Sequence, residues 1–334
     1  MDSVHNLLST KLPDGVTFKI PEVTRDYVFK SLISLDCTKA TGLDEISAYF
    51  LKLSAAEITE SITHVLNCSI QGSIVPTQWK KSKVIPIFKS DSTLEVSNYR
   101  PISILPVLSK ILEHHVHDAL TRFLNAYGLI RESQSGFREG HSCETALLKI
   151  IDDWNKSIDS GYLIGSVFLD LRKAFDLVNH SILIDKLSAY GLSDLSVAWF
   201  RSYLSNRKQV TCVDGVISPP MSVTCGVPQG SILGPLLFVL YLNDMDQVIN
   251  HCSAGMYADD TTLYVKGKST VDLNMKINED MAHVSKWCNR NKMVINRKKT
   301  KCMLVGSRQR LATMRNNSLN ITVEDINIEN VHCE

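Results

Sequence analysis

The sequence predicts a mixed α/β (α+β) protein with more than one subdomain. The chain has 334 residues, of which 44% are hydrophobic and 21% are charged, so it can bury a large core. Stretches with helical spacing of apolar residues alternate with short β-like runs along its length. Two β-like pairs surround turn signals, an Asp-Asp pair at residues 259–260 and an Asp-Gly pair at residues 214–215. Helices and hairpins in one chain favour this fold class.

Composition and charge exclude several classes of protein. The formal net charge of +1 does not by itself indicate nucleic-acid binding, although basic residues cluster at positions 80–83 and 297–301. The nine cysteines form no C-x-x-C pair, so we expect reduced thiols in an intracellular protein, with neither a disulfide framework nor a zinc site. The first residues lack the pattern of a signal peptide, and no apolar run approaches the length of a membrane span.

The first third of the chain predicts three helices and one hairpin. After an irregular stretch over residues 1–24, helical spacing covers residues 25–35, 47–71 and 107–127, and Gly128 is a natural stop for the last of these. A β-like run at residues 84–88 ends at Lys89, and a polar loop then leads to Arg100. Two cations on adjacent strands would suit a triphosphate, since a guanidinium can bind two phosphate oxygens. The alternative is a pair of solvated surface cations.

The middle of the chain predicts a polar loop, a helix and a buried strand. The loop at residues 134–141 ends in His141, which could bind a backbone group or a phosphate, and we favour the structural role. Ser142, with Thr145 beyond it, predicts the start of a helix that runs to Gly161. Residues 162–169 form a nearly continuous apolar run, which predicts a strand buried on both faces.

Three carboxylates are the main candidates for chemistry. Asp170 ends the buried strand, and Asp259 and Asp260 lie at the tip of the hairpin expected over residues 256–265. If that strand lies beside the hairpin in one sheet, the three carboxylates converge. Such a cluster could bind two Mg²⁺ ions about 4 Å apart, which would activate an attacking hydroxyl and stabilise a leaving phosphate. The alternative for the Asp-Asp pair alone is a solvated hairpin tip.

The remaining elements complete the expected fold. We expect helices over residues 181–190, 194–204, 236–242 and 271–288 and a β-hairpin over residues 209–224. A turn rich in glycine and proline at residues 226–235 would let the backbone approach a flat or phosphorylated ligand. Two short strands are expected at residues 291–296 and 298–306, around a basic turn.

Seven blocks in a fixed order carry a resemblance to a known family. They are KVIPIFK (83–89), NYRPIS (98–103), QSGFR (134–138), FLDLRKAFD (168–176), GVPQGS (226–231), YADD (257–260) and NRKKT (296–300). Over roughly residues 39–306 the chain resembles the reverse transcriptases of non-LTR (LINE-type, jockey-like) retrotransposons. The resemblance implies a right-hand polymerase, with mixed α/β fingers and a palm whose antiparallel sheet carries the carboxylates.

The resemblance implies a role for individual residues. Asp170, Asp259 and Asp260 match the metal-binding triad, and Lys299 matches a candidate proton donor to pyrophosphate. For Asp176 a structural ion pair is as plausible as a chemical role. The implied nucleotide contacts are the finger cations Lys89 and Arg100 at the β and γ phosphates, the backbone amides of Lys173 and Ala174, Phe175 as a steric gate against a ribose 2′-hydroxyl, and Gln229 with Gly230.

The resemblance also implies cofactors, partners and a division of the chain. We expect an RNA-directed DNA polymerase that uses two Mg²⁺ ions, for which Mn²⁺ can substitute, with an RNA template, a DNA primer and dNTP as partners and no membrane. The expected location is the nucleus or a cytoplasmic ribonucleoprotein. The expected division is a lead-in (1–38), fingers (39–160), palm (161–306) and the start of a truncated connection to the thumb (307–334), with the endonuclease and thumb missing. The alternative is a truncated, non-catalytic RNA-binding remnant.

Overall fold

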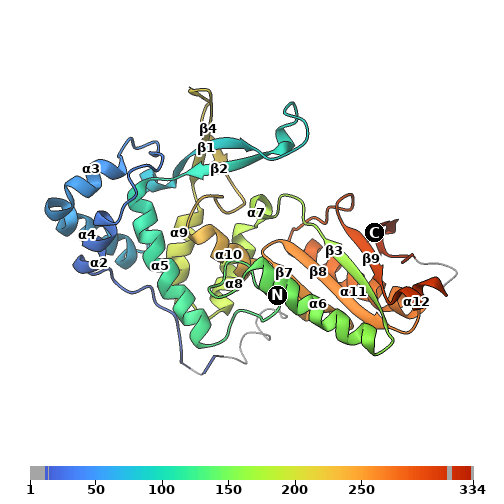
Figure 1. Cartoon of the computed structure of the whole chain (residues 1–334). Coiled ribbons are helices and arrows are strands. Elements are labelled where there is room, and N and C mark those ends of the chain that lie inside the picture. The colour runs from blue at the N-terminus through green and yellow to red at the C-terminus, as the bar shows by residue number, and fades with distance from the viewer. Residues whose placement is uncertain (1–11, 14, 314–317, 332–334) are drawn as a thin grey trace. The chain divides into compact units, whose positions relative to one another are not determined.

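The chain divides into two compact units, and each unit is built from two separate parts of the sequence. The computed structural model describes residues 12–13, 15–313 and 318–331. Unit 1 contains Met1–Leu129 and Val178–Phe238, and unit 2 contains Ile130–Leu177 and Val239–Glu334 (Figure 1). Residues 178–238, which the sequence analysis assigned to the palm, therefore group with the N-terminal part. The division into fingers and palm stays a prediction.

Unit 2 is built on a five-stranded sheet with the strand order β12-β9-β3-β8-β7. The central strand β3 runs antiparallel to both of its neighbours, β8 and β9. Six of its seven residues are buried, which confirms the predicted buried strand. The strands are β3 (Leu163–Leu169), β7 (Ser253–Tyr257), β8 (Asp260–Gly267), β9 (Lys301–Val305) and β12 (Glu329–Asn330).

Helices α6 (Cys143–Asp159) and α11 (Thr270–Arg290) cover opposite faces of this sheet (Figure 1). Ile164 in β3 packs in one apolar cluster with Ile150 of α6. The next residue, Gly165, faces α11, since a Cβ added there would lie 2.6 Å from Cδ1 of Ile277. Successive side chains of a strand point to opposite faces, so β3 contributes to both halves of the core.

The start of α6 confirms the predicted cap. Ser142 and Thr145 form a capping box, in which each side chain accepts a hydrogen bond from the other residue's backbone N–H. Shorter elements complete unit 2: α7 (Ala174–Leu177), the 3₁₀ helix η3 (Met245–Val248), α12 (Arg308–Ala312), β10 (Thr322–Val323) and β11 (Ile326–Asn327).

Unit 1 contains a second sheet, in which β1 pairs with β2 and with β4, and β4 also pairs with β5 and β6. Asp214 and Gly215 both have positive φ (49° and 82°), as the predicted Asp-Gly hairpin turn requires. The strands are β1 (Lys81–Phe88), β2 (Tyr99–Ile104), β4 (Arg207–Val213), β5 (Val216–Ile217) and β6 (Met221–Val223).

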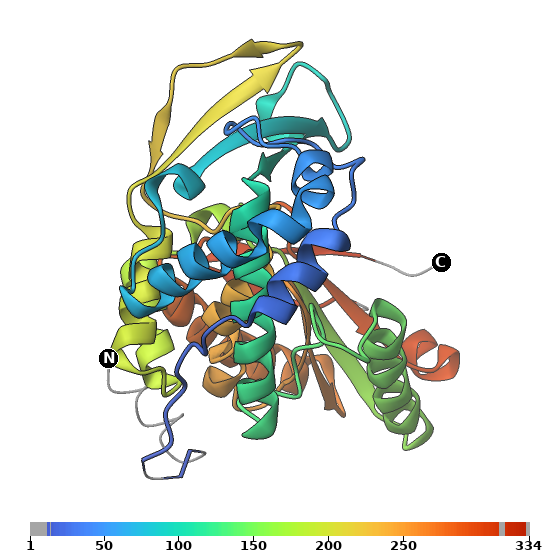
Figure 2. The ribbon, with the colours of Figure 1, turned by 90° about the vertical axis from the view of Figure 1, so that its left-hand side faces the viewer.

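The helices of unit 1 pack around α5 (Val107–Ala126), with the blue helices α2 to α4 in front of the teal α5 in Figure 2. In α5 the buried carboxylate of Glu113 accepts hydrogen bonds from the Tyr203 hydroxyl and from the backbone N–H groups of Ile232 and Leu233. It thereby caps α10 (Leu233–Leu242), because the first N–H groups of a helix have no intrahelical partner. The other elements are α2 (Arg25–Ile33), α3 (Ala48–Leu53), α4 (Ala55–Gln71), α8 (His180–Ala189), α9 (Asp194–Leu204), η1 (Thr77–Lys80) and η2 (Val96–Asn98).

Two predicted elements need correction. The single helix expected over residues 47–71 is two helices, α3 and α4, which meet at Ser54, where ψ is 11° and the side-chain hydroxyl donates to the Phe50 carbonyl. The strand expected at residues 291–296 was wrong, because this segment forms only one bridge, between Ile295 and Leu171. The other expected helices and hairpins are present, with boundaries within a few residues.

The described residues also bear on membrane spans and disulfides. None of the helices there is both long and apolar enough to cross a membrane. Eight of the nine cysteines fall in the described part of the chain, and all eight carry free thiols.

Candidate active site

The three candidate carboxylates lie at one end of the unit 2 sheet. In the β3–β8 ladder Leu169 pairs with Thr261, so Asp170, which follows Leu169, and Asp260, which precedes Thr261, lie at the same end of neighbouring strands. Asp259 lies in the two-residue turn between the paired residues Tyr257 and Asp260. Asp170 and Asp259 are half-buried and Asp260 is exposed. The strand that ends at Asp170 therefore lies beside the hairpin in one sheet, as the sequence analysis expected, and the three positions lie at the same end of that sheet.

The backbone of Asp170 is held on both sides by the segment before β9. Its N–H donates to the Thr300 hydroxyl (3.2 Å), and its carbonyl accepts from the Asn296 N–H (2.8 Å). Thr300 is fully buried. Lys299 is exposed and lies in the tight turn closed by the hydrogen bond from its own N–H to the Asn296 carbonyl (3.1 Å). This turn brings the predicted proton donor into the segment that contacts Asp170.

The donor set fits a hard divalent cation, although the side chains are not gathered around one point. Among the described residues, no three His, Cys, Asp or Glu side chains are grouped so that they could hold a metal ion. Neighbouring carboxylates repel each other, and a divalent cation is what draws such groups together. Carboxylate oxygens are the ligands that Mg²⁺ and Mn²⁺ prefer. The strand register thus supplies three carboxylates of a suitable chemical kind at one sheet end.

The chain turns sharply after Asp170 and enters the short helix α7. Lys173 has a φ of 46°, a left-handed conformation that is uncommon for a residue with a side chain, and its carbonyl accepts from the N–H groups of Asp176 and Leu177. Ala174 is buried at the start of α7, and Phe175 is half-buried. The ring of Phe175 lies edge-on to the ring of Phe137, with centroids 6.2 Å apart. Phe175 lies five residues beyond Asp170, in the short helix α7 that follows the turn.

Four predicted nucleotide contacts lie in unit 1, next to strand β2. Arg100 pairs with Ile87 across the β1–β2 ladder, and Lys89 continues that ladder with a hydrogen bond to the Asn98 carbonyl (2.8 Å). Both cations are exposed and are diagonal neighbours. The carbonyl of Gln229 accepts from the Ser103 N–H (2.6 Å), and a Cβ at Gly230 would lie 2.5 Å from the Ser103 carbonyl oxygen. The glycine-rich turn thus contacts Ser103 of β2, the same strand that carries Arg100.

The comparison with known families decides which protein class carries these residues. A profile of the family described as reverse transcriptase (RNA-dependent DNA polymerase) matches residues 80–325. The chain belongs to the reverse transcriptase family. The match covers every predicted site residue, from Lys89 to Lys299.

Three relatives of this reverse transcriptase domain come from mobile elements of Drosophila melanogaster. The probable RNA-directed DNA polymerase from transposon X-element is 33% identical over 270 residues, which cover 78% of this chain and 29% of the relative. The RNA-directed DNA polymerase from mobile element jockey is 27% identical over 295 residues, 86% of this chain and 32% of the relative. A putative 115 kDa protein in the type-1 retrotransposable element R1DM is 27% identical over 315 residues, 92% of this chain and 30% of the relative.

These relatives confirm the resemblance to reverse transcriptases of non-LTR, LINE-type retrotransposons. This chain spans about a third of the length of the curated relatives it matches. The family match at residues 80–325 identifies the shared region as the reverse transcriptase domain.

A buried polar contact beside the carboxylates was not predicted from the sequence. The side chain of Gln134 is fully buried and hydrogen-bonds to the backbone of Ala258, the residue before Asp259. His141, for which we favoured a structural role, contacts the Ser135 hydroxyl (3.3 Å), and burial together with the charge of Arg138 lowers its pKa. A polar residue between two serines, 124 positions away from its partner, gives little local signal of such a contact.

Proposed function

We propose that this reverse transcriptase domain catalyses RNA-directed DNA synthesis at the end of the β3–β8 strand pair. The observation that carries the proposal is the register of Leu169 with Thr261, which brings Asp170 to the same strand end as Asp259 and Asp260. Carboxylates at one sheet end are suitable ligands for the divalent ions of a nucleotidyl transferase. The family match supports the same reaction class.

The proposed reaction joins a nucleotide to a primer. The 3′-oxygen of the primer bonds to the α-phosphorus of a dNTP, the bond from that phosphorus to the oxygen bridging the α and β phosphates breaks, and pyrophosphate leaves. The proton of the 3′-hydroxyl passes to solvent. Two Mg²⁺ ions held by Asp170, Asp259 and Asp260 would lower the pKa of that hydroxyl and offset the charge that develops on the leaving group. The ammonium of Lys299 is the proposed proton donor to pyrophosphate.

The remaining residues bind and select the nucleotide in this proposal. The backbone N–H groups of Lys173 and Ala174 are the proposed donors to the triphosphate, since the left-handed φ of Lys173 turns the chain sharply after Asp170. Phe175 would exclude a ribose 2′-hydroxyl by its size. The cations Lys89 and Arg100 and the turn that contains Gln229 and Gly230 are the nucleotide contacts proposed for unit 1.

Primer extension on an RNA template tests the proposal. We expect Asp259→Ala to lower the rate at least about 10³-fold, because it removes a ligand on which positioned charge depends. The matched control is Asp152→Asn, an exposed carboxylate on α6 that pairs with Lys156, and it should extend primers like the parent. Extension by Asp259→Ala within about tenfold of the parent would contradict the metal assignment. A parent chain that binds RNA but never extends a primer would favour the non-catalytic alternative.

A further inference from the structure

The loop that carries the QSGFR block lies against the hairpin that contains Asp259 and Asp260. On strand β7 the Met256 N–H donates to the Ser133 carbonyl (2.7 Å), and the Met256 carbonyl accepts from the Ser135 N–H (2.8 Å). Between these two bonds Gln134 forms a parallel bridge with Met256. The loop therefore acts as a short additional strand beside β7, up to the point where the hairpin turns.

The Gln134 side chain extends this pairing by two residues, from Met256 to Ala258. Its Oε1 accepts from the Ala258 N–H (3.0 Å), and its Nε2 donates to the Ala258 carbonyl (3.3 Å). The same Oε1 also accepts from the Gly136 N–H (2.7 Å). One fully buried amide thus satisfies both backbone groups of Ala258. Without it these groups would have to pair elsewhere or remain unpaired.

Ala258 needs such support because of its backbone conformation. Its φ is 57°, in the left-handed region that favours glycine, and this residue alone separates β7 from Asp259. The loop also approaches it closely, since a Cβ at Gly136 would lie 2.2 Å from the Ala258 nitrogen. The direction in which the chain leaves Ala258 sets where the Asp259 carboxylate lies.

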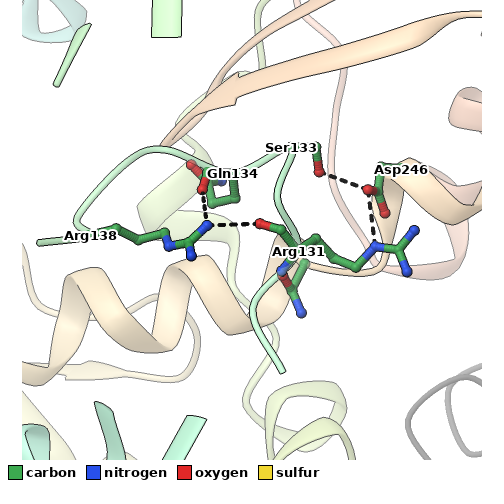
Figure 3. A network of polar contacts seen from close by, with 6 residues as sticks. Arg131, Ser133, Gln134, Arg138 and Asp246 are labelled. Carbon is green, nitrogen blue, oxygen red and sulfur yellow. Dashed lines mark hydrogen bonds and ion pairs between the residues drawn. The ribbon is translucent and has the colours of Figure 1, made fainter. Parts of the chain in front are cut away.

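The loop is itself fixed within unit 2 by an ion pair and several hydrogen bonds (Figure 3). Arg138 closes the loop, because its Nη1 donates to the carbonyls of Arg131 (3.1 Å) and Gln134 (2.8 Å). Asp246 in η3 accepts from Arg131 Nε (3.1 Å) and from the Ser133 hydroxyl (2.7 Å). Gln134 is therefore attached to a part of the unit that does not belong to the hairpin.

We propose that Gln134 is a positioning residue, whose amide holds Ala258 in the left-handed conformation and thereby aims the Asp259 carboxylate at the metal site. The inference rests on the proposed function, because it assumes that Asp259 binds a divalent cation. Gln134 itself contacts neither the cation nor the nucleotide in this proposal. It acts on the metal site indirectly, because its two hydrogen bonds to the Ala258 backbone fix the position of Asp259.

The first test measures Mn²⁺ binding to the full chain without substrate, by electron paramagnetic resonance of the free ion. Gln134→Met keeps the length of the side chain and removes all three hydrogen bonds. We expect the apparent Kd for Mn²⁺ to rise about tenfold or more, the range found when groups that orient metal ligands are lost. The matched control is Gln247→Met, because Gln247 is a half-buried glutamine of the same unit whose Oε1 has no hydrogen bond. It should bind Mn²⁺ like the parent.

The second test asks whether a more permissive backbone at position 258 restores the Mn²⁺ affinity that Gln134→Met loses. Glycine adopts positive φ without strain, so Ala258→Gly should make the turn less dependent on the amide. We expect Gln134→Met/Ala258→Gly to recover most of the Mn²⁺ affinity that Gln134→Met loses. In primer extension, Gln134→Met should lower kcat about 10²-fold, as small misplacements of catalytic groups do, with KM for dNTP within about threefold.

The outcomes separate the two proposals. If Asp259→Ala weakens Mn²⁺ binding and Gln134→Met does not, the positioning role is wrong and the proposed function stands. If Asp259→Ala leaves Mn²⁺ binding unchanged, the metal site of the proposed function is wrong. Should Gln134→Met fail to fold, Gln134→Glu replaces it, because its carboxylate accepts the same two bonds but cannot donate to the Ala258 carbonyl. Unchanged Mn²⁺ affinity and kcat in Gln134→Glu would overturn the positioning role.

Discussion

Two hairpins carry four of the predicted charged residues of the site, Asp259 and Asp260 on one and Lys89 and Arg100 on the other, and they are built in opposite ways. The β7–β8 hairpin of unit 2 reverses in two residues, one of them left-handed, and a buried side chain from another segment binds its turn. The β1–β2 hairpin of unit 1 has a long connection between Phe88 and Tyr99, and nearly all of it is exposed. Its internal hydrogen bonds are local, such as that from Asn98 Nδ2 to the Ser92 carbonyl.

The difference follows from what each charge has to do. Carboxylates that bind a metal must lie within a fraction of an ångström of the productive geometry, so a rigid turn suits them. Lysine and arginine side chains reach a phosphate on long flexible stems, and an exposed hairpin can carry them without such fixation. We therefore expect changes around the β7–β8 turn to lower kcat and changes in the β1–β2 hairpin to raise KM.

Apart from the loss of a carboxylate or of the Gln134 amide, Gly136→Ala should give the largest effect, because it pushes the loop away from the turn. Its Cβ would lie 2.2 Å from the Ala258 nitrogen, a backbone atom that cannot rotate away. We expect kcat to fall about 10²-fold, as for other misplaced catalytic groups. Gly140→Ala in the same loop is the control, since its Cβ would meet nothing within 4 Å and only its φ of 75° opposes the change. Equal losses in the two variants, measured by primer extension, would contradict the claim that contact with the turn matters.

Replacing Asp280 tests what holds the other end of the β7–β8 hairpin, where β7 begins. This buried side chain of α11 accepts from the N–H groups of Asn250, His251 and Cys252, directly before β7. Burial alone would raise the pKa of its carboxyl, but these backbone donors together hold it below the usual value. We expect Asp280→Asn to cost about 1–3 kcal/mol near neutral pH, seen as faster hydrogen exchange at residues 250–257.

The pH dependence of this effect has a definite sign. Because the pKa of Asp280 is lower in the folded chain, its contribution to stability is fully present above the unfolded value of about 4. The contribution is lost as the pH falls through the lower, folded value. The difference in exchange between parent and Asp280→Asn should therefore shrink in acid. A difference that stays constant from neutral pH to well below the unfolded pKa would contradict the role of the charge.

Arg100→Ala should act on binding rather than on the chemical step. A hydrogen bond to a charged group contributes roughly 1.5–3 kcal/mol, so we expect KM for dNTP to rise about tenfold while kcat changes little. Lys208→Ala removes another exposed cation of the same sheet, outside the predicted contacts, and should leave KM unchanged. If Arg100→Ala instead lowers kcat at constant KM, the expectation that the β1–β2 hairpin acts on binding and the β7–β8 turn on the chemical step is wrong.

Phe175→Val gives the smallest expected change in rate and tests selectivity. The smaller side chain would leave space for a 2′-hydroxyl, so incorporation of ribonucleotides relative to dNTP should rise several-fold, the scale that a change in pocket size gives. Phe137→Leu, which alters the ring that contacts Phe175, should leave this ratio unchanged. An unchanged ratio in an active Phe175→Val variant would assign Phe175 to core packing.

The sequence predicted most of the fold because its signals are local. The apolar run of β3, the helical face of α5 and the turn residues at 214–215 each specify an element from neighbouring positions. Asp170 and the Asp259–Asp260 pair could be grouped because buried strands and hairpins tend to join one sheet. The strand expected at residues 291–296 was wrong because its pattern did not reveal that only Ile295 finds a partner.

The contact between Gln134 and Ala258 could not be predicted in this way. It joins a loop to a turn 124 residues later, and its strength depends on burial that only the tertiary structure supplies. The positive φ of Ala258 was equally hidden, because alanine gives no signal of a left-handed conformation. The grouping of residues 178–238 with the N-terminal part was hidden for the same reason, because it depends on long-range packing.

The most direct test of the central claim is to locate Mn²⁺ by anomalous scattering in crystals of this domain grown with dNTP and Mn²⁺. We expect two ions, about 3.5–4 Å apart, bound by carboxylate oxygens of Asp170, Asp259 and Asp260. We also expect Gln134 to keep its hydrogen bonds to Ala258 in that state. Mn²⁺ bound elsewhere, with these three carboxylates directed away from it, would contradict the proposed metal site.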